Sequence, residues 1–420
     1  MEIKQKLYLH IDAYKNILLD NKKIAVAVSG GMDSLALMFV AKEWCDNNTV
    51  ELAAITVDHQ LREKSRMEAE YVSDLCRKYE IEHHILTWND EKPDTNVEAA
   101  AREARYKLMD AFCRENDIKL LLVAHHLQDQ AETFFIRLFR GSGVDGLSAM
   151  NDIGNLYSLT ILRPFLKAKK EDFKTLLEDM GIKWVEDESN GDEKYLRNKI
   201  RNFLNGFDNK NEIIDRINSA IENIKDTKRC IDVLINKIEK NIVSFNSFGC
   251  CFVDKNKLLQ QDDIIALKIL ATISMKISGN IYKPRLKKLI KLFENIKNND
   301  DVKYTFYGCV FETYKDNLLV VYREYNSIGE DKNLIFGNEV TWDGRFSIKL
   351  KEQVDNIKIT HVKKGEFKKI LRNVRETNGK KYKEMTNIRN VEKDIFYTLP
   401  VVLLNDEYVL DCNFVEIKLL

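Results

Sequence analysis

The chain has 420 residues and a mass of 49.0 kDa, and at roughly 100 to 200 residues per domain it has room for about two to four domains. Its 44% hydrophobic and 31% charged residues exclude collagen-like, disordered and membrane-spanning classes. Lys plus Arg (66) equals Asp plus Glu (66), so a nucleic-acid surface can only come from local segregation of charge.

The cysteines and the N-terminal residues indicate the cellular compartment of the protein. The 8 cysteines are scattered, and the N-terminal sequence MEIKQKLYLHIDAYK lacks the apolar core of a secretory signal. We therefore expect free thiols in a reducing cytoplasm. No apolar run approaches the ~18 residues that a membrane helix needs, so a soluble cytoplasmic protein is predicted.

The first 200 or so residues alternate β-rich runs with helical stretches, as in a parallel sheet covered by helices. The predicted strands are Ile24–Val28, Leu52–Val57, Ile81–Leu86 and Leu120–Ala124. The predicted helices lie near Ser34–Trp44, Arg66–Tyr79 and Asn96–Glu115. This order predicts an α/β fold with an N-terminal, Rossmann-type parallel sheet.

The pattern changes after Gly206, where isoleucines recur at helical spacing towards Ile242. Two β-like segments, Tyr304–Tyr314 and Asn317–Tyr322, follow, and a mixed region begins near Ser327. We predict an α/β domain at 1–208, a helix-rich middle domain with a terminal β-hairpin at 209–326, and a small mixed α/β domain at 327–420.

The most informative segment is IAVAVSGGMDS, residues 24–34, in which a buried strand runs through two glycines into a helix. Glycines let the backbone approach a ligand, and amides at a helix start point towards an anion. Ser29 and Ser34 can donate hydroxyl hydrogen bonds, and Asp33 can hold Mg²⁺ against phosphate oxygens. The segment is neither a Walker A sequence nor G-x-G-x-x-G. Alone, it could also be an ordinary capped turn.

Further segments follow in a specific order. They are VDHQLR (57–62), AAREARY (100–106), AHHLQDQAET (124–133), RLFRGSGVDG (137–146), Arg163-Pro164 and DESNGDEKYLRNKIR (187–201). SGGMDS resembles the SGGxDS signature of the PP-loop ATP pyrophosphatases. Together with the other segments, which span about half of the chain, it resembles the tRNA(Ile)-lysidine synthetase family.

This resemblance implies a reaction with ATP and Mg²⁺ in which the C2 oxygen of the wobble cytidine of a CAU-anticodon tRNA(Ile) is adenylated. Free L-lysine then displaces AMP through its ε-amine, which attacks only when neutral. The residues implied for the nucleotide are Ser29, Gly30, Gly31, Met32, Asp33, Ser34, Asp58, His59, Arg102 and His125. Those implied for catalysis are Asp33, Arg105, Asp129 and Glu132.

Two pairs of charged residues carry the expected chemistry. Asp129 and Glu132 lie three apart, so a helix would place both carboxylates on one face, where they could receive the lysine ammonium. Arg102 and Arg105 are similarly spaced and could contact phosphate. A solvated acidic face and surface ion pairs of the arginines, respectively, are the alternatives.

Other residues bear on metals and on divergence. His125-His126 lacks the additional ligands that a zinc site needs. Gln128 stands where related sequences often have another Asp, and Gln60 stands where a glycine is frequent. The first departure removes one candidate Mg²⁺ ligand.

Basic residues suggest where tRNA could bind. Residues 362–393 contain eleven Lys/Arg against four Glu, including Lys380 and Lys381, and such a stretch can contact RNA phosphates. The helix predicted around Lys283–Lys291 is also basic. Arg197 and Arg201 are further tRNA candidates. A solvated helix face explains either basic stretch equally well.

Two other functions stay open at this stage. A PP-loop tRNA thiolase would normally show catalytic or cluster-binding cysteines near the core, whereas Cys45, Cys76 and Cys113 fall inside predicted helices. A non-catalytic nucleotide- or RNA-binding protein would not need Asp33 and Asp129. A homodimer is neither predicted nor excluded.

Overall fold

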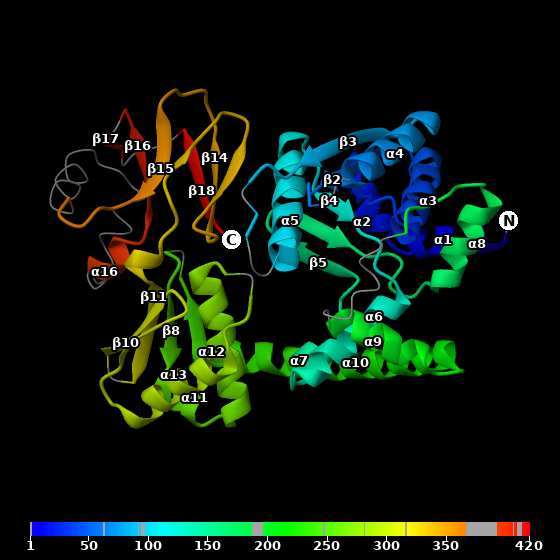
Figure 1. Cartoon of the computed structure of the whole chain (residues 1–420). Coiled ribbons are helices and arrows are strands. Elements are labelled where there is room, and N and C mark those ends of the chain that lie inside the picture. The colour runs from blue at the N-terminus through cyan, green and yellow to red at the C-terminus, as the bar shows by residue number, and fades with distance from the viewer. Residues whose placement is uncertain are drawn as a thin grey trace. The chain divides into compact units, whose positions relative to one another are not determined.

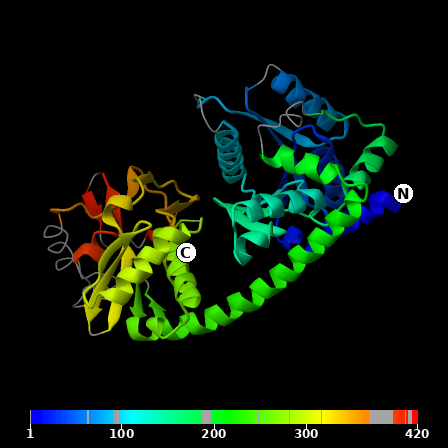
Figure 2. The same cartoon turned by 60° about the horizontal axis from the view of Figure 1, so that its bottom comes forward.

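A computed structural model describes most of the chain (Figure 1). The described residues are 2–61, 64–90, 92–93, 97–186, 196–246, 248–280, 282–315, 317–366, 393–405, 407–409 and 414–420. They form two compact units, Met1–Cys230 and Ile231–Leu420. The division falls inside α10 (Lys210–Ile242), the long green helix of Figure 2. The predicted three-domain division stays a prediction, and its second and third parts share one unit from residue 231 on.

The first unit contains a six-stranded sheet in the order β3-β2-β1-β4-β6-β5. All neighbours pair in parallel except β5, which is antiparallel to β6. The strands are β1 (Lys23–Ala27), β2 (Glu51–Asp58), β3 (Glu82–Thr87), β4 (Leu120–Leu122), β5 (Ile153–Leu156) and β6 (Leu159–Leu162). The predicted strands correspond to β1–β4, and the predicted α/β class with an N-terminal parallel sheet is confirmed.

Helices cover both faces of this sheet because side chains alternate along each strand. Ile24 and Val26 of β1 join the core formed with α1, α3, α4 and α8, whereas Ala25 packs into the core on the α5 side. The helices are α1 (Glu2–Asp12), α2 (Lys15–Leu19), α3 (Met32–Asn48), α4 (Lys64–Lys78), α5 (Val97–Glu115), α6 (Leu127–Phe139), α7 (Val144–Leu147), α8 (Lys170–Asp179) and α9 (Leu196–Asn205). The three predicted helices are thus α3, α4 and α5.

The second unit begins with an antiparallel sheet in the order β7-β8-β11-β10-β9. Its strands and helices are β7 (Val243–Phe245), β8 (Cys251–Asp254), α11 (Lys255–Leu259), α12 (Asp263–Ser278), α13 (Leu286–Asn298), β9 (Lys303–Phe306), β10 (Cys309–Lys315) and β11 (Leu318–Arg323). The predicted β segment Tyr304–Tyr314 is two strands, because Tyr307 and Gly308, at φ 56° and 73°, turn the chain between them.

Two smaller sheets complete the second unit, in the orders β12-β15-β16-β17 and β13-β14-β18. Their elements are η2 (Tyr325–Ser327), β12 (Lys332–Asn333), β13 (Glu339–Trp342), β14 (Phe346–Leu350), β15 (Ile357–His361), α16 (Lys393–Phe396), β16 (Pro400–Leu404), β17 (Glu407–Val409) and β18 (Val415–Leu419). Trp342 and Ile348 of one sheet pack with Ile359 and Val402 of the other, so the two sheets share a core.

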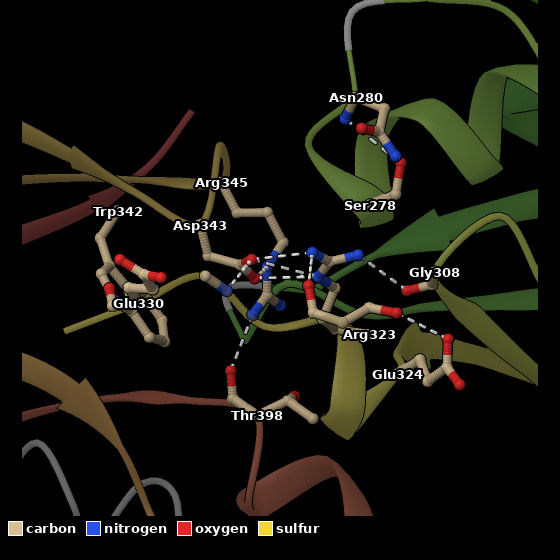
Figure 3. A network of polar contacts seen from close by, with 12 residues as sticks. Ser278, Asn280, Gly308, Arg323, Glu324, Glu330, Trp342, Asp343, Arg345 and Thr398 are labelled. Atoms are coloured by element: carbon tan, nitrogen blue, oxygen red, sulfur yellow. Dashed lines mark hydrogen bonds and ion pairs between the residues drawn. The ribbon is translucent and has the colours of Figure 1, made fainter. Parts of the chain in front are cut away.

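A buried ion triad joins the end of β11 to the β13–β14 turn (Figure 3). Asp343 accepts from Arg323 Nη2 at 2.8 Å and from Arg345 Nε at 2.7 Å. Arg345 also donates to the Thr398 carbonyl at 2.8 Å, and Arg323 donates to that of Gly308 at 3.0 Å. The triad therefore ties residues before 326 to residues after it. In the part of the chain described, no helix is long and apolar enough to cross a membrane.

Candidate functional site

The turn between β1 and α3 lets the backbone approach a ligand. Gly30 has φ +81°, where an L side chain is strained, and a Cβ there would meet Val72 Cγ2 and Val185 Cγ2 at 3.4 Å. Ser34 Oγ accepts from the Ser29 amide at 3.1 Å and donates to the Gly31 carbonyl at 2.9 Å. The α3 helix begins at Met32, so its first amides have no intrahelical acceptor and can donate to an anion.

Asp33 lies in the first turn of α3 with one carboxylate oxygen unused. Its Oδ1 is buried without a hydrogen-bond partner, and its Oδ2 lies 3.5 Å from His126 Nε2. No group of three or more His, Cys, Asp or Glu suited to a metal occurs among the described residues. A free carboxylate oxygen still fits Mg²⁺, which commonly uses one or two protein carboxylates together with phosphate oxygens.

His126 connects Asp33 to α6. It caps that helix, with its Nδ1 accepting from the Gln128 amide at 3.2 Å and its own amide donating to Asp129 Oδ2 at 3.0 Å. Its Nε2 lies 3.6 Å from the same Asp129 oxygen. Burial opposes ionisation of Asp129, but His126, His125 and Arg197 outweigh it and lower the pKa of Asp129 to about 2. Asp129 is therefore an anion at neutral pH.

Glu132 is fully buried and engaged by arginines on both oxygens. Its Oε2 accepts from Arg197 Nε at 2.8 Å, and its Oε1 accepts from Arg201 Nε at 2.7 Å and from Gln128 Nε2 at 3.1 Å. Arg197 Nη2 also lies 3.4 Å from Asp129 Oδ1. Although burial opposes it, the charge of Glu132 raises the pKa of Arg201. The predicted shared face of Asp129 and Glu132 is therefore present, with α9 arginines against it.

Cationic residues collect at the same sheet edge. Arg102 and Arg105 have no carboxylate partner among the residues that the structure describes, and Arg102 lies over the Tyr106 ring at 5.3 Å. Burial lowers the pKa of Arg105. Arg163 follows β6 and donates through Nη1 to the Asn151 carbonyl at 3.0 Å, while its Nε is buried without a partner. These cations suit an anionic ligand.

Two histidines at this edge are neutral. Burial, aided by Arg105, lowers the pKa of His59 to about 4, and burial also lowers that of His125 to about 4. The Nδ1 atom of each is buried without a partner. Within the described part of the chain, eight buried side-chain N or O atoms have no hydrogen-bond partner, and four of them belong to Asp33, His59, His125 and Arg163. Orphaned polar atoms normally find partners, so their gathering marks a ligand site.

Asp58 differs from these residues because its carboxylate accepts hydrogen bonds from the loop that follows it. Its Oδ1 accepts from the Gln60 amide at 3.0 Å and from the Ser65 hydroxyl. Gln60 has φ 52°, a conformation that glycine adopts without strain, which accounts physically for the glycine expected at this position. Asp58 thus shapes the loop that carries His59.

Comparison with known proteins identifies the family. Residues 3–206 match the model of the PP-loop domain. A tRNA(Ile)-lysidine synthase from Wolbachia pipientis wMel is 35% identical over 387 residues, which cover 91% of this chain and 86% of that protein. The chain belongs to the tRNA(Ile)-lysidine synthase family. A synthase of the same name from Rickettsia felis is 31% identical over 96% of this chain and 93% of that protein.

A more distant likeness appears among solved structures. A U34-tRNA thiolase from Methanococcus maripaludis covers 53% of this chain and 79% of that one, with 19% identity and a TM-score of 0.42. In this member of the lysidine synthase family, Cys45, Cys76 and Cys113 are buried in α3, α4 and α5, and burial raises the pKa of each thiol to about 12. These three thiols are therefore poor nucleophiles.

Most residues predicted for this family's site lie together, while some lie beyond the described chain. Asp33, Asp129 and Glu132 are linked through His126, Arg197 and Arg201, whereas Arg105 belongs to the cationic group near His59. Lys380, Lys381 and residues 187–195 of the DESN segment lie outside the described residues.

Sequence reasoning left three contributors without a role. His126 lies between Asp33 and Asp129 and contacts both. The sequence indicated only that it follows the end of the fourth predicted strand. Arg163 belongs to the Arg163-Pro164 motif, but its place at the sheet edge depends on β6, which the sequence pattern does not predict. Gln128 donates to Glu132. At position 128 this chain therefore has an amide donor where an Asp, a candidate Mg²⁺ ligand, was expected.

Proposed function

We propose that this chain ligates L-lysine to C2 of the wobble cytidine of a CAU-anticodon tRNA(Ile), through an adenylated tRNA and with release of pyrophosphate and AMP. One observation carries the proposal: Asp33, a carboxylate with a free oxygen, shares a sheet edge with cations that have no carboxylate partner among the described residues. Such an edge can bind a polyphosphate and neutralise the charge that develops on it.

ATP would bind with its phosphates against the glycine turn. The Ser29 hydroxyl and the first amides of α3 can donate to phosphate oxygens, and Arg102, Arg105 and Arg163 can balance their charge. Mg²⁺ held by Asp33 would supply further charge neutralisation. Neutral His59 and His125 can exchange hydrogen bonds with the nucleotide, since each has an unused Nδ1. Attack by the cytidine O2 on the α-phosphate then expels pyrophosphate.

Lysine would bind next to α6. Asp129 is ionised, and among the residues that the structure describes its Oδ1 has only the 3.4 Å contact with Arg197, so it is the better placed carboxylate for an ammonium group. Both oxygens of Glu132 already accept from arginines, so a direct contact with lysine requires one arginine to move. The neutral ε-amine attacks C2, and the former O2 leaves with AMP.

The tRNA would approach from the arginine side of the site. Arg197 and Arg201 are 37% and 28% exposed, and they can reach RNA phosphate while they hold Glu132. Lys380 and Lys381 remain proposed contacts away from the reaction centre. Replacing both with Ala is expected to weaken tRNA binding and to flatten its salt dependence by up to about one unit of slope for each phosphate that is no longer neutralised.

The proposal is tested by AMP formation from ATP with purified protein, tRNA(Ile) transcript and lysine. Turnover is expected only when both tRNA and lysine are present, and mass spectrometry of the tRNA should show lysine at the wobble cytidine. Turnover that needs a sulfur donor would support the thiolase, and nucleotide binding without turnover would support the binding protein. Either result contradicts the proposed ligation.

A further inference from the structure

Large aromatic side chains are exposed near the candidate site. Phe139, at the end of α6, is 63% exposed, and Phe203, on α9, is 51% exposed. Phe207, just beyond α9, is 39% exposed. Burying a phenylalanine stabilises a protein, so several exposed on adjoining elements indicate a surface that another molecule covers.

These rings form a continuous series, which we call the aromatic ladder: Phe139, Phe135, Phe203 and Phe207. Successive ring centroids are separated by 6.0, 5.7 and 5.2 Å. The base of the ladder is packed, because Ala131 of α6, Ile200 and Leu204 of α9 and Ile214 of α10 form one small core against which Phe135 lies. Figure 1 shows these three helices close together. The exposed rings therefore project from elements that are packed together, and each touches the next ring of the series.

The charge around the ladder points to an anionic partner. Residues 133–144 and 196–207, which carry the ladder, contain five Lys/Arg and no Asp or Glu. Arg140 and Lys199 are exposed, and neither forms an ion pair in the described part of the chain. Aromatic faces next to unpaired cations are the combination that binds single-stranded nucleic acid.

The ladder is also continuous with the candidate site. Asp129 and Phe139 belong to one helix and are ten residues apart, which is about 15 Å at 1.5 Å per residue. Arg197, which contacts Asp129 and Glu132, shares α9 with Phe203. A nucleotide that reacts beside Asp129 would therefore bring its unpaired neighbours to these rings.

We propose that the aromatic ladder stacks against unpaired anticodon-loop bases next to the reacting cytidine, while Arg140 and Lys199 contact the adjoining phosphates. This inference rests on the proposed function. Stacking depends little on base identity, so the ladder supplies affinity and position, and discrimination among tRNAs must come from other contacts.

The experiment compares the wild type with Phe139→Ala, Phe203→Ala and the double variant. Dissociation constants are measured for the tRNA(Ile) transcript and for its anticodon stem-loop. Loss of a stacked base is expected to weaken binding of both RNAs by about 10- to 100-fold in the double variant. With 2-aminopurine in place of the anticodon adenine, the wild type should quench fluorescence and the double variant should not.

Three controls separate stacking from damage to the fold. Leu9→Ala removes an apolar side chain of similar exposure, 57%, on α1 and should leave RNA affinity unchanged. Phe139→Trp keeps a stacking face and should retain wild-type affinity. ATP binding measured without RNA should be the same in all variants, because no ladder residue belongs to the nucleotide edge.

Other outcomes overturn the inference. If the wild type forms lysidine and the double variant binds RNA within twofold of it, the ladder does not bind the loop while the proposed function stands. If the variants lose only self-association in sedimentation and keep RNA affinity, a second copy covers the surface. A wild type that neither binds nor modifies the tRNA overturns both proposals.

Discussion

Replacing Glu132 with Gln tests whether this carboxylate holds the α9 arginines in place. The fully buried side chain accepts from Arg197 at 2.8 Å, from Arg201 at 2.7 Å and from Gln128 at 3.1 Å. A glutamine has one acceptor oxygen, and each oxygen of Glu132 accepts from an arginine, so the NH₂ group of the substituted side chain would face Arg197 or Arg201, which can only donate. At least one charge-assisted hydrogen bond is lost, and Arg197 and Arg201 both lose the negative charge of Glu132.

The size of the effect follows from the exposure of the arginines. Removing one partner of a fully buried ion pair costs about 3–5 kcal/mol. Water reaches Arg197 and Arg201, which are 37% and 28% exposed, so we expect a smaller loss. About 2–3 kcal/mol is reasonable, near the value of one charge-assisted hydrogen bond. For a unit of this size, that lowers the melting temperature by roughly 4–12 °C.

The assay joins calorimetry with the two half-reactions. Melting is followed for the wild type, for Glu132→Gln and for Glu178→Gln, whose exposed carboxylate lies 3.8 Å from Lys174 and should not matter. Glu132→Gln should reduce both tRNA-dependent ATP–pyrophosphate exchange and lysine transfer, because the displaced arginines serve both. Unchanged melting with intact exchange and a higher lysine requirement would refute this reasoning and make Glu132 a lysine-binding residue alone.

Three further predictions concern charge, protons and space. Asp33→Asn should keep the wild-type melting temperature and slow AMP formation by about 100- to 1000-fold, since it removes charge where a metal would bind; near-normal AMP formation would exclude Asp33 from the mechanism. Burial lowers the pKa values of His59, His83 and His125 from 6.5 to about 4 in the folded protein. Below pH 6.5 these histidines therefore bind more protons in the unfolded chain than in the folded one. Urea midpoints should therefore fall as the pH is lowered from about 6.5 to 4, and His83→Gln should flatten this slope by up to about one proton; a flat profile would contradict the burial argument. Gly279→Ala would place a Cβ 2.5 Å from the Asp343 carbonyl oxygen, whereas at Gly337, also at positive φ, a Cβ meets nothing within 4 Å. In urea titrations Gly279→Ala should cost about 1–3 kcal/mol more than Gly337→Ala, and equal losses would show that the close approach is relaxed.

Local patterns in the sequence were enough to predict the glycine turn after β1 and the helix that follows it. The conformation of the segment from β1 through Gly30 to Asp33 can be predicted locally. Its buried strand, its glycine at positive φ and its helix start are neighbours in the chain. The shared face of Asp129 and Glu132 follows from helical spacing alone. These features need no knowledge of distant contacts.

Distant contacts decided what the sequence could not predict. Both oxygens of Glu132 accept hydrogen bonds from Arg197 and Arg201. These arginines are 65 and 69 residues away and share no local sequence pattern with Glu132. The β5–β6 hairpin has short strands and a turn through Tyr157 at φ 55°, so neither strand length nor turn chemistry indicated it. Without β6, Arg163 could not be placed at the carboxyl edge.

The buried triad limits where the gene can be divided. A fragment that ended at residue 326 would keep Arg323, only 7% exposed, and lose Asp343, the carboxylate that neutralises it. A fragment that began at 327 would leave Arg345 and Asp343 without the Arg323 side chain that completes the triad. Removing one member of a buried charged group is strongly destabilising. Truncation, domain exchange and split-protein designs should therefore keep residues 323–345 in one polypeptide, and recombination between homologues should favour other crossover points.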